Sequence, residues 1–395
     1  GFNFNIGCYF KSGGVGNSVL DLGNSTVNIG GTASLGTFEI SALANAQLIA
    51  GTSTIRMLGG SNDFILPSLF YGGGKQYYKL EMVNKSILNG GGGISFYEAR
   101  FLNDTRVFGD NYYENVWIDP GVTLSLSPST IQEIDELGTF TASGNCTDLV
   151  FINSTQPGSQ AYISKASGMI TLSNVLIKDN HVLGNADFQA VNSVDLGNTS
   201  GWTFTLPPTR TLYWVNGGGD WRDSGHWSLS SGGLGGNCAP RPVDNINFDN
   251  NSGFLVGSET VLLDKDMAFC KDMIWSVNTG VPPKFKSTSD QLFYLYGSLT
   301  FSTFMIELFD PEVHFMGNGS HNIDLAGKSL FRVYFDGSGE WILQNDFNVI
   351  GACGNFSGYC YHQSGTLRTN GFNFNIGCYF KSGGVGNSVL DLGNS

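Results

Sequence analysis

The hydrophobic and polar residues of this chain alternate in short runs from one end to the other. Gly, Asn, Ser and Thr separate these runs about every eight to twelve residues, and the runs are rich in Val, Ile, Phe, Leu and Thr. Alternation with a period of two is typical of β-strands that bury one face. Only Gly36–Ile49 and Pro128–Leu137 resemble helices, and both are short. The pattern therefore predicts an all-β protein.

The strand-like runs also recur at a longer interval of about 24 residues. This interval separates the apolar centres of four successive runs, which are Leu299, Ile323, Phe347 and Phe372. Elsewhere the interval shortens to about 21 or 22 residues. A drifting repeat with several strands is typical of a β-solenoid, in which no coil can bury its apolar face without a neighbour. We therefore expect a parallel β-helix, right-handed by the usual chirality of parallel crossovers.

Aligned repeats predict which side chains stack on one another. An offset of about 25 residues brings an apolar residue and an asparagine to the same point of successive coils: Phe347-Asn348 with Phe372-Asn373, and Phe2-Asn3 with Val27-Asn28. Successive coils of a β-helix lie about 4.8 Å apart, so that like side chains form ladders. We expect the apolar residues to fill the core and the asparagine amides to form an outward ladder of hydrogen bonds.

The interval from Pro207 to Asn250 interrupts the repeat. It contains four of the eleven prolines and three of the seven tryptophans of the chain. A proline lacks the amide hydrogen that a strand ladder requires, so we expect the coils to pause at Pro207 and the proline after it. We interpret residues 207–250 as a small β-junction between β-helix coils at 1–206 and at 251–395. Three aromatic residues would form the centre of this junction: Trp214, Trp221 and Trp227.

The beginning of the chain recurs without change at its end. Residues 1–25 and 371–395 are identical, so the sequence repeats with a period of about 370 residues. Two copies of independent origin would have diverged. We therefore expect the chain to belong to a tandem array, in which residues 371–395 form the first coil of the next block. Adjacent repeats of the same chain would then cap each other's end coils.

Composition and charge narrow the class of protein. Gly accounts for 55 of 395 residues and charged residues for only 13%, whereas about a quarter is usual. A hydrophobic content of 41% is sufficient for a large core and argues against a disordered chain. The net charge of −13 argues against binding to nucleic acid, whose phosphates require a basic surface. Apolar runs are too short for a membrane-spanning helix, so we expect no membrane insertion by this segment.

One period of the sequence contains six cysteines, since one of the seven falls in the duplicated segment. An even number is compatible with three disulfides in an oxidising compartment and equally with buried thiols. Cys353 and Cys378 lie at equivalent points of neighbouring coils, where the Cα atoms come within disulfide reach. Cys360, which follows Cys353 closely, competes for it. A second candidate pair is Cys238 with Cys270.

Parallel β-helices include polysaccharide lyases and hydrolases, and two acids at i and i+2 on one strand face can divide acid and base roles. Three groups have this spacing: Asp264 with Asp266, Glu133 with Asp135 and Glu136, and Asp310 with Glu312. None is stacked with further acids and with Arg or Lys at the coil spacing, as an extended saccharide groove requires. We interpret these groups as solvated strand faces, and we predict no enzymatic activity and no cofactor.

Metal ligands are also weakly indicated. The five histidines have no metal-ligand spacing, and His226, which precedes a tryptophan, is interpreted as a packing residue. The run from Asp244 to Asn251 offers many oxygen atoms to calcium, but it lacks the glycine and the distal glutamate of an EF-hand loop. An alternating edge strand is the simpler interpretation, with calcium as the alternative.

Several motifs resemble a known family. In chain order they are Leu20-Asp21-Leu22-Gly23-Asn24-Ser25, Asp195-Leu196-Gly197-Asn198, Gly201-Trp202-Thr203-Phe204, Tyr213-Trp214-Val215, Gly217-Gly218-Gly219-Asp220-Trp221, His226-Trp227-Ser228, Gly339-Glu340-Trp341-Ile342-Leu343 and Leu367-Arg368-Thr369-Asn370-Gly371-Phe372-Asn373. Together they resemble the tandem blocks of giant cell-surface adhesins of Bacteroidetes that are exported by the type 9 secretion system. Among these, the gliding-motility adhesins are the most similar in kind. The resemblance covers nearly the whole chain, and the junction motif is its most specific part.

The resemblance implies an extracellular, cell-surface filament that attaches to substrata, through surface polysaccharide, while the gliding and secretion machinery carries it. It implies no adhesive residue in this block. We expect a structural role, in which continuous ladders make a stiff shaft. The alternative is a carbohydrate-binding module whose exposed aromatics, for instance Tyr213 or Trp221, stack on sugar rings. A polysaccharide lyase or hydrolase is a third interpretation.

Overall fold

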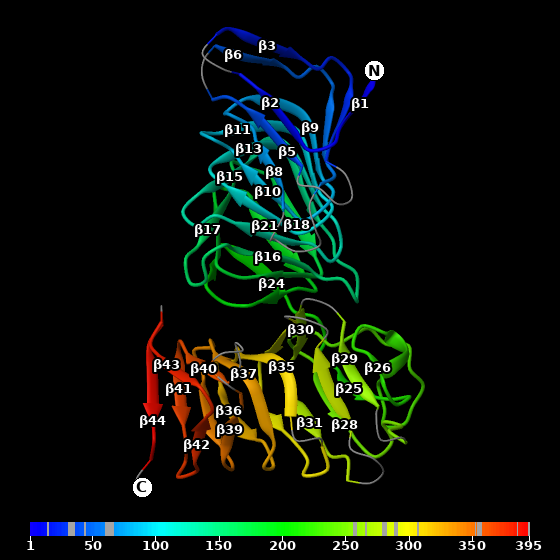
Figure 1. Ribbon diagram of the computed structural model, residues 1–395, viewed down its shortest axis with the longest axis vertical. Coiled ribbons are helices and arrows are strands. Elements are labelled where there is room, and N and C mark those ends of the chain that lie inside the picture. The colour runs from blue at the N-terminus through cyan, green and yellow to red at the C-terminus, as the bar shows by residue number, and fades with distance from the viewer. Residues whose placement is uncertain are drawn as a thin grey trace. The chain divides into compact units, whose positions relative to one another are not determined.

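The computed structural model describes residues 1–13, 16–30, 36–42, 45–59, 67–255, 259–264, 267–278, 283–287, 291–305, 308–351, 353, 358–384 and 386–393. Apart from one turn of 3-10 helix at Ser224–His226, the regular structure in these ranges consists of β-strands (Figure 1). The prediction of an all-β protein is confirmed. Both stretches that resemble helices in the sequence contain strands instead, because their apolar residues alternate and pair with neighbouring strands.

The chain divides between Pro207 and Pro208 into two compact units, which we call unit 1 (residues 1–207) and unit 2 (residues 208–395). Each unit contains two long sheets, to which the chain returns repeatedly. Neighbouring strands come from segments about one repeat apart: Asn28 bonds to Asn5, 23 residues earlier, and Asn375 bonds to Asn348, 27 residues earlier. Long parallel sheets are therefore the main feature of both units.

In unit 1 two long parallel sheets and two short ones are formed. The ten-stranded sheet contains β1 (Asn3–Ile6), β4 (Thr26–Ile29), β7 (Thr54–Met57), β9 (Gln76–Met82), β11 (Ile94–Phe101), β13 (Asn111–Ile118), β15 (Ile131–Ala142), β17 (Ala161–Lys165), β20 (Asn180–Leu183) and β23 (Thr199–Ser200). The nine-stranded sheet contains β2 (Tyr9–Ser12), β5 (Thr37–Ile40), β8 (Ser68–Tyr71), β10 (Ser86–Asn89), β12 (Thr105–Phe108), β14 (Thr123–Leu126), β16 (Val150–Ser154), β19 (Val175–Ile177) and β22 (Val194–Asp195). The short sheets are β18 (Met169–Ser173), β21 (Asp187–Val191) and β24 (Trp202–Thr205), and β3 (Ser18–Asp21) with β6 (Ala46–Ile49).

In unit 2 the arrangement is similar, with a single antiparallel pair at one end of a sheet, between β27 and β25, among the described strands. One sheet contains β27 (Trp227–Ser228), β25 (Thr211–Trp214), β28 (Asn245–Phe248), β31 (Met273–Trp275), β34 (Leu299–Thr300), β36 (Ser320–Asp324), β38 (Glu340–Leu343), β41 (Gly365–Arg368) and β44 (Ser388–Asp391). The other contains β26 (Gly219–Asp220), β29 (Thr260–Leu263), β30 (Met267–Cys270), β32 (Lys284–Ser287), β33 (Leu292–Leu295), β35 (Leu308–Phe315), β37 (Ser329–Phe335), β39 (Phe347–Val349), β40 (Tyr359–His362), β42 (Phe374–Ile376) and β43 (Tyr379–Ser382).

Each unit has its own hydrophobic core, into which alternate residues of the strands point. In unit 1, the ring of Phe38 stacks between Phe10 and Phe70, with centroid distances of 5.2 and 5.1 Å. Because the strands are parallel and in register, like side chains fall into columns, and stacked rings attract one another beyond their area burial. The alternation seen in the sequence thus becomes a column of apolar side chains that runs through each unit.

The tryptophans of the interval 207–250 lie in the core of unit 2. Strand β25 pairs with β28, and β28 pairs with β31, so this interval contributes to the same sheet as the later strands. Trp214 packs edge-to-face on Trp227 at 5.1 Å, and Trp221 packs edge-to-face on Trp227 at 4.9 Å. Trp221 is only 3% exposed, so the expectation that its ring is free to stack on sugars is wrong.

Candidate functional site

The two copies of the duplicated segment are the first place to look for function, since each has neighbours on one side. The first copy forms β1, β2 and β3, which pair with β4, β5 and β6. The second copy forms β42, β43 and β44, which pair with β39, β40 and β41. In the part of the chain that is described, no strand pairs with the other edge of either copy. Large apolar side chains remain exposed in both, at Phe4 and Tyr9 and at Tyr379.

The register of these strands differs by two positions from the predicted one. Phe374, not Phe372, lies opposite Phe347, and Asn375, not Asn373, lies opposite Asn348. Phe372 is 36% exposed, so its predicted stacking on Phe347 is wrong. A shift by two positions keeps every side chain on its own face, so the alternation of residues cannot reveal it.

The same shift occurs in the first copy. Val27 lies opposite Phe4 and Asn28 lies opposite Asn5, so the predicted partners Phe2 and Asn3 are wrong. Asparagine ladders are nevertheless present at both places. The Nδ2 of Asn28 donates to the Oδ1 of Asn5 at 2.8 Å, and the Nδ2 of Asn375 donates to the Oδ1 of Asn348 at 2.8 Å. Asn373 lies outside this ladder and donates to Asp346.

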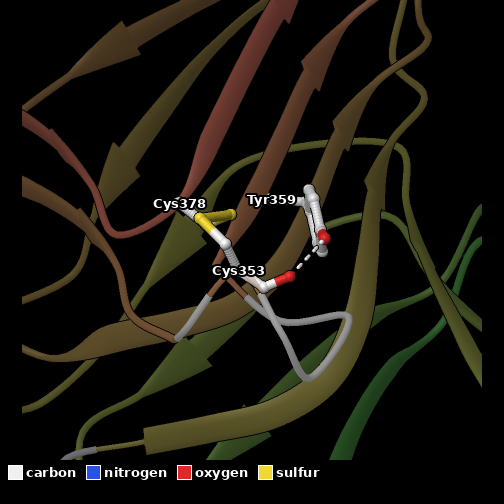
Figure 2. Close-up of a disulfide and its surroundings, with 3 residues drawn as sticks. All are labelled: Cys353, Tyr359 and Cys378. Atoms are coloured by element: carbon white, nitrogen blue, oxygen red, sulfur yellow. Dashed lines mark hydrogen bonds between the residues drawn. A yellow bond between two sulfur atoms is a disulfide. The ribbon is translucent and has the colours of Figure 1, made fainter.

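A disulfide joins Cys353 to Cys378 of the second copy, with 5.0 Å between the Cα atoms (Figure 2). The hydroxyl of Tyr359 donates to the carbonyl oxygen of Cys353 at 3.2 Å. Cys360 and Cys270 are buried free thiols. The predicted pair of Cys238 with Cys270 is therefore wrong, and Cys360 does not take Cys353, because its side chain points into the core. Burial raises the pKa of the Cys360 thiol well above its usual value.

The oxygen-rich run proposed for calcium begins with a carboxylate that is already fully paired. The side chain of Asp244 is completely buried and accepts hydrogen bonds from Arg210 Nη2 at 2.6 Å and Arg241 Nε at 3.0 Å. Burial alone raises the pKa of Asp244, but the hydrogen bonds from the two arginines outweigh it and hold the pKa below its usual value. No group of three or more metal-ligating His, Cys, Asp or Glu side chains occurs within the described ranges.

The acids of β15 support the backbone around them. The hydroxyl of Tyr112 donates to Asp135, and this hydrogen bond raises the pKa of Tyr112 to about 12 and lowers that of Asp135. The buried ammonium of Lys165 donates to the carbonyl oxygens of Asp135, Glu136 and Gly138, at 2.6, 2.9 and 3.0 Å. These contacts hold a β-bulge of β15 in place, where the pairing with β13 shifts register.

The other two acidic groups are only partly described. Burial raises the pKa of Asp264, which accepts a hydrogen bond from the backbone amide of Arg222 at 3.1 Å. Its predicted companion, Asp266, lies outside the described residues, as does the side chain of Asp310. Glu312 pairs with Arg332 at 3.2 Å and with His314 at 2.9 Å.

His314 is the centre of a small cluster on the outward face of β35 that the sequence does not reveal. Its Nδ1 lies 2.6 Å from Asp336 and its Nε2 lies 2.9 Å from Glu312. Its ring stacks on Tyr334 at 4.5 Å, and Tyr294 covers the other side at 5.0 Å. Burial by itself lowers the pKa of His314, but the two carboxylates outweigh burial and raise the pKa above its usual value.

This cluster predicts a dependence of stability on pH. Because the pKa of His314 is higher in the folded than in the unfolded state, its contribution is complete below about pH 6.5 and is lost as the pH rises through the folded value. At pH 6 we expect His314→Gln to lower the free energy of unfolding by about 1–2 kcal/mol, measured by urea denaturation. The difference from wild type should shrink toward pH 9.

His321→Gln provides the control, since burial lowers the pKa of His321. Its contribution to stability should therefore rise with pH, opposite to that of His314. A difference between wild type and His314→Gln that stays constant from pH 6 to pH 9 would contradict the ionised cluster.

A line of charged side chains crosses the outward face of unit 1 and ends on an exposed tryptophan. Arg56 of β7 pairs with Glu81 of β9 at 2.7 Å, and Lys79 of β9 bridges to Glu98 of β11 at 3.1 Å. The guanidinium of Arg100, which also pairs with Glu98, lies 5.5 Å from the ring centroid of Trp117 on β13. We call this line, from Arg56 to Trp117, the charged row.

Exposed aromatic rings lie on the same strands as the charged row. The ring of Trp117 is 43% exposed, and that of Tyr97 is 42% exposed and stacks on Tyr78 at 4.7 Å. Tryptophan and tyrosine with one free face are the side chains that stack on sugar rings. Sequence reasoning missed Trp117, although it lies between the buried Val116 and Ile118 in the alternation of β13 and so faces outward.

Among the described residues, no helix is long and apolar enough to cross a membrane. No protein family, curated protein or solved structure matches the chain.

Proposed function

We propose that this chain is one block of the shaft of a long, extracellular adhesin filament, and that each unit is a β-helix, right-handed by the usual chirality of parallel crossovers. One observation supports the proposal above all: in each long sheet, neighbouring strands come from segments about one repeat apart in the sequence. Such a ladder resists bending, because each rung is hydrogen-bonded to the rungs above and below it. The acidic, hydrated surface limits lateral association between neighbouring filaments.

The tandem nature of the shaft is supported by the duplicated segment. Its two copies, residues 1–25 and 371–395, are identical, and each leaves a strand edge without a partner among the described strands. Unprotected strand edges promote association, so a continuing block is the simplest way to cover them. Attachment to surfaces, gliding motility and export by the type 9 secretion system are part of the proposal and rest on the resemblance of several motifs to that family of adhesins.

Electron microscopy of the native protein tests the shaft. We expect long unbranched filaments of uniform width at the cell surface, labelled on intact cells by antibodies against this block. Compact particles of a single block, or labelling only after the cells are lysed, would contradict the proposal.

A second candidate function is the binding of polysaccharide on the outward face of unit 1. The specific observation that favours it is the exposed ring of Trp117 beside Arg100, on the same strands as the exposed Tyr97. The exposed ring of Trp117 suits a glycan whose sugar face can stack on it, while Arg100, which also pairs with Glu98, can donate to oxygens of the sugar.

Trp117→Ala tests this function directly. On an array of neutral and acidic polysaccharides, we expect any specific binding to weaken about ten-fold, equivalent to about 1.4 kcal/mol. Trp117→Phe, which retains a ring, should keep most of the affinity. Binding that is equally strong in wild type and Trp117→Ala would remove this face from consideration, and no binding to any glycan would leave the shaft as the function of this block.

A further inference from the structure

We propose that the duplicated segment is a shared rung: between two blocks it pairs through one edge with unit 2 of the preceding block and through the other edge with unit 1 of the following block. The inference rests on the proposed tandem shaft and specifies how its blocks join. The partner of each unpaired strand edge is thus the adjacent block, which has the same sequence. Three independent observations on the two copies support it.

The first observation is that the two copies use different backbone atoms. Outside the regular ladders between paired strands, the atoms of the first copy that bond to the following strands and turns are the carbonyl oxygens of Phe2, Ile6, Cys8, Ser12, Gly23 and Ser25 and the amides of Ser18 and Leu22. In the second copy, the corresponding atoms that bond to the preceding strands and turns are the carbonyl oxygens of Asn373, Asn387 and Asp391 and the amides of Phe372, Gly377, Cys378, Tyr379 and Gly383. When residues 371–395 are given their equivalent numbers 1–25, no atom occurs in both sets.

This division has a simple geometric cause. Successive residues of a strand direct their amide and carbonyl groups to opposite edges, so that along β1, β2 and β3 even-numbered residues serve one edge and odd-numbered residues the other. Apart from Gly23 and Ser25, which follow β3, the first set contains even-numbered residues. The second set contains odd-numbered residues, with the amides of Phe372 and Cys378 as the exceptions. Because the two sets use different atoms, one segment can offer both sets of hydrogen bonds at once, one from each edge.

The second observation concerns the apolar side chains. Ile6, Phe10 and Leu20 of the first copy pack, partly buried, against the core of unit 1. Their equivalents in the second copy, Ile376, Phe380 and Leu390, pack in the same way against the core of unit 2. Each of these side chains is only partly covered in its own copy. In a shared rung the three would be covered on both sides, so that the core of unit 2 continues into the core of the next unit 1.

The third observation is that the polar side chains also complement one another. In the first copy Asn5 accepts a hydrogen bond from Asn28, whereas in the second copy the equivalent Asn375 donates one to Asn348. The ion pairs divide likewise: Lys11 reaches Glu39 of the following strand at 2.7 Å, and Asp391 is reached by Arg368 of the preceding strand at 2.5 Å. A shared rung would complete one continuous asparagine ladder and hold both ion pairs.

The disulfide then becomes a covalent link at the joint between blocks. Cys8 is an exposed free thiol, and its equivalent Cys378 is bonded to Cys353 (Figure 2). In an array, the cysteine of every shared rung would bond to Cys353 of the block before it. Formation of this bond removes two protons and two electrons from the two thiols, and an external disulfide such as oxidised glutathione accepts them and is cleaved to two thiols.

A chain of two blocks, in which residues 1–370 are followed directly by residues 1–395, tests the shared rung by hydrogen exchange. Conservative substitutions at Lys11 and Val19 in the first copy, and different ones at the equivalent Lys381 and Val389 in the last, give the three copies different masses. We expect the inner copy to protect the amides of both edges. The amides equivalent to Tyr9 and Gly13 should exchange at least ten-fold more slowly than in the first copy, and those equivalent to Ser18 and Leu22 at least ten-fold more slowly than in the last.

Phe10→Ala provides a second measurement. Placed in the inner copy, it should speed exchange both in β40 of the first block and in β5 of the second, whereas in the first copy it should affect β5 alone. Without reductant, iodoacetamide should label the cysteine of the first copy and spare that of the inner copy. An inner copy that protects only one edge would overturn the shared rung, even where microscopy shows filaments; absence of filaments would instead count against the shaft.

Discussion

Replacement of Asp244 by alanine is expected to lower the free energy of unfolding of unit 2 by about 3–5 kcal/mol, because it leaves two arginine side chains without their buried counter-ion. Asp244 has no exposed side-chain surface and accepts hydrogen bonds from the side chains and the backbone amides of both Arg210 and Arg241. Together these contacts fix the start of β25 next to the turn before β28.

Urea denaturation followed by tryptophan fluorescence measures this effect, since five of the seven tryptophans lie in unit 2. Asp220→Ala, at an exposed carboxylate of the same unit, is the matched control and should change the free energy of unfolding by less than about 0.5 kcal/mol. Equal free energies of unfolding for the two variants would show that the buried ion pairs make no net contribution to the stability of the fold.

The same carboxylate predicts a loss of stability in acid. The pKa of Asp244 is lower in the folded than in the unfolded state, so its contribution is complete above the unfolded value of about 3.9 and is lost as the pH falls through the folded value. The difference between wild type and Asp244→Ala should therefore persist at pH 5 and decrease only below about pH 4.

The second large effect is expected for Phe248→Ala, which should lower the free energy of unfolding of unit 2 by about 3–5 kcal/mol through loss of buried area and creation of a cavity. The Phe248 ring is completely buried and stacks on Trp275 at 3.9 Å and on Trp214 at 5.7 Å. It thus connects the tryptophans of the interval 207–250 to the later strands of the unit.

Hydrogen exchange measures which strands lose stability in Phe248→Ala. If the tryptophan-rich interval and the later strands unfold together, Phe248→Ala should speed exchange in β36 and β38 as well as in β25 and β28. Phe248→Leu, which retains most of the volume, should cost less than about 1.5 kcal/mol. Unchanged exchange in β36 and β38 would indicate that the interval unfolds by itself.

Much of the fold could be predicted from the pattern of residues alone. Alternation identifies strands and their buried faces, and the recurrence of Phe347-Asn348 and Val27-Asn28 marks segments that stack. It does not give the register, because a shift by two positions leaves the same faces inside and outside. Only the pairing of the folded strands decides that Asn348 meets Asn375 rather than Asn373.

The candidate sites depend still more on contacts between distant residues. The sequence places Asp244 in a run of possible calcium ligands, and only the fold brings Arg210 to it from 34 residues away. Trp221 belongs to a polar-looking segment, yet it packs against Phe285 of a later strand. Trp117, by contrast, keeps a free face, because the alternation of β13 directs its ring away from the core.

By itself the sequence determined what is periodic: an all-β chain, its inward and outward faces, and a segment that occurs twice. The tertiary structure decided what depends on pairing: the register of the ladders, the partner of Cys353, and the division of one segment's hydrogen bonds between two opposite edges. The physical reason is that a side chain's face follows from its own strand, whereas its partner follows from the path of the whole chain between them.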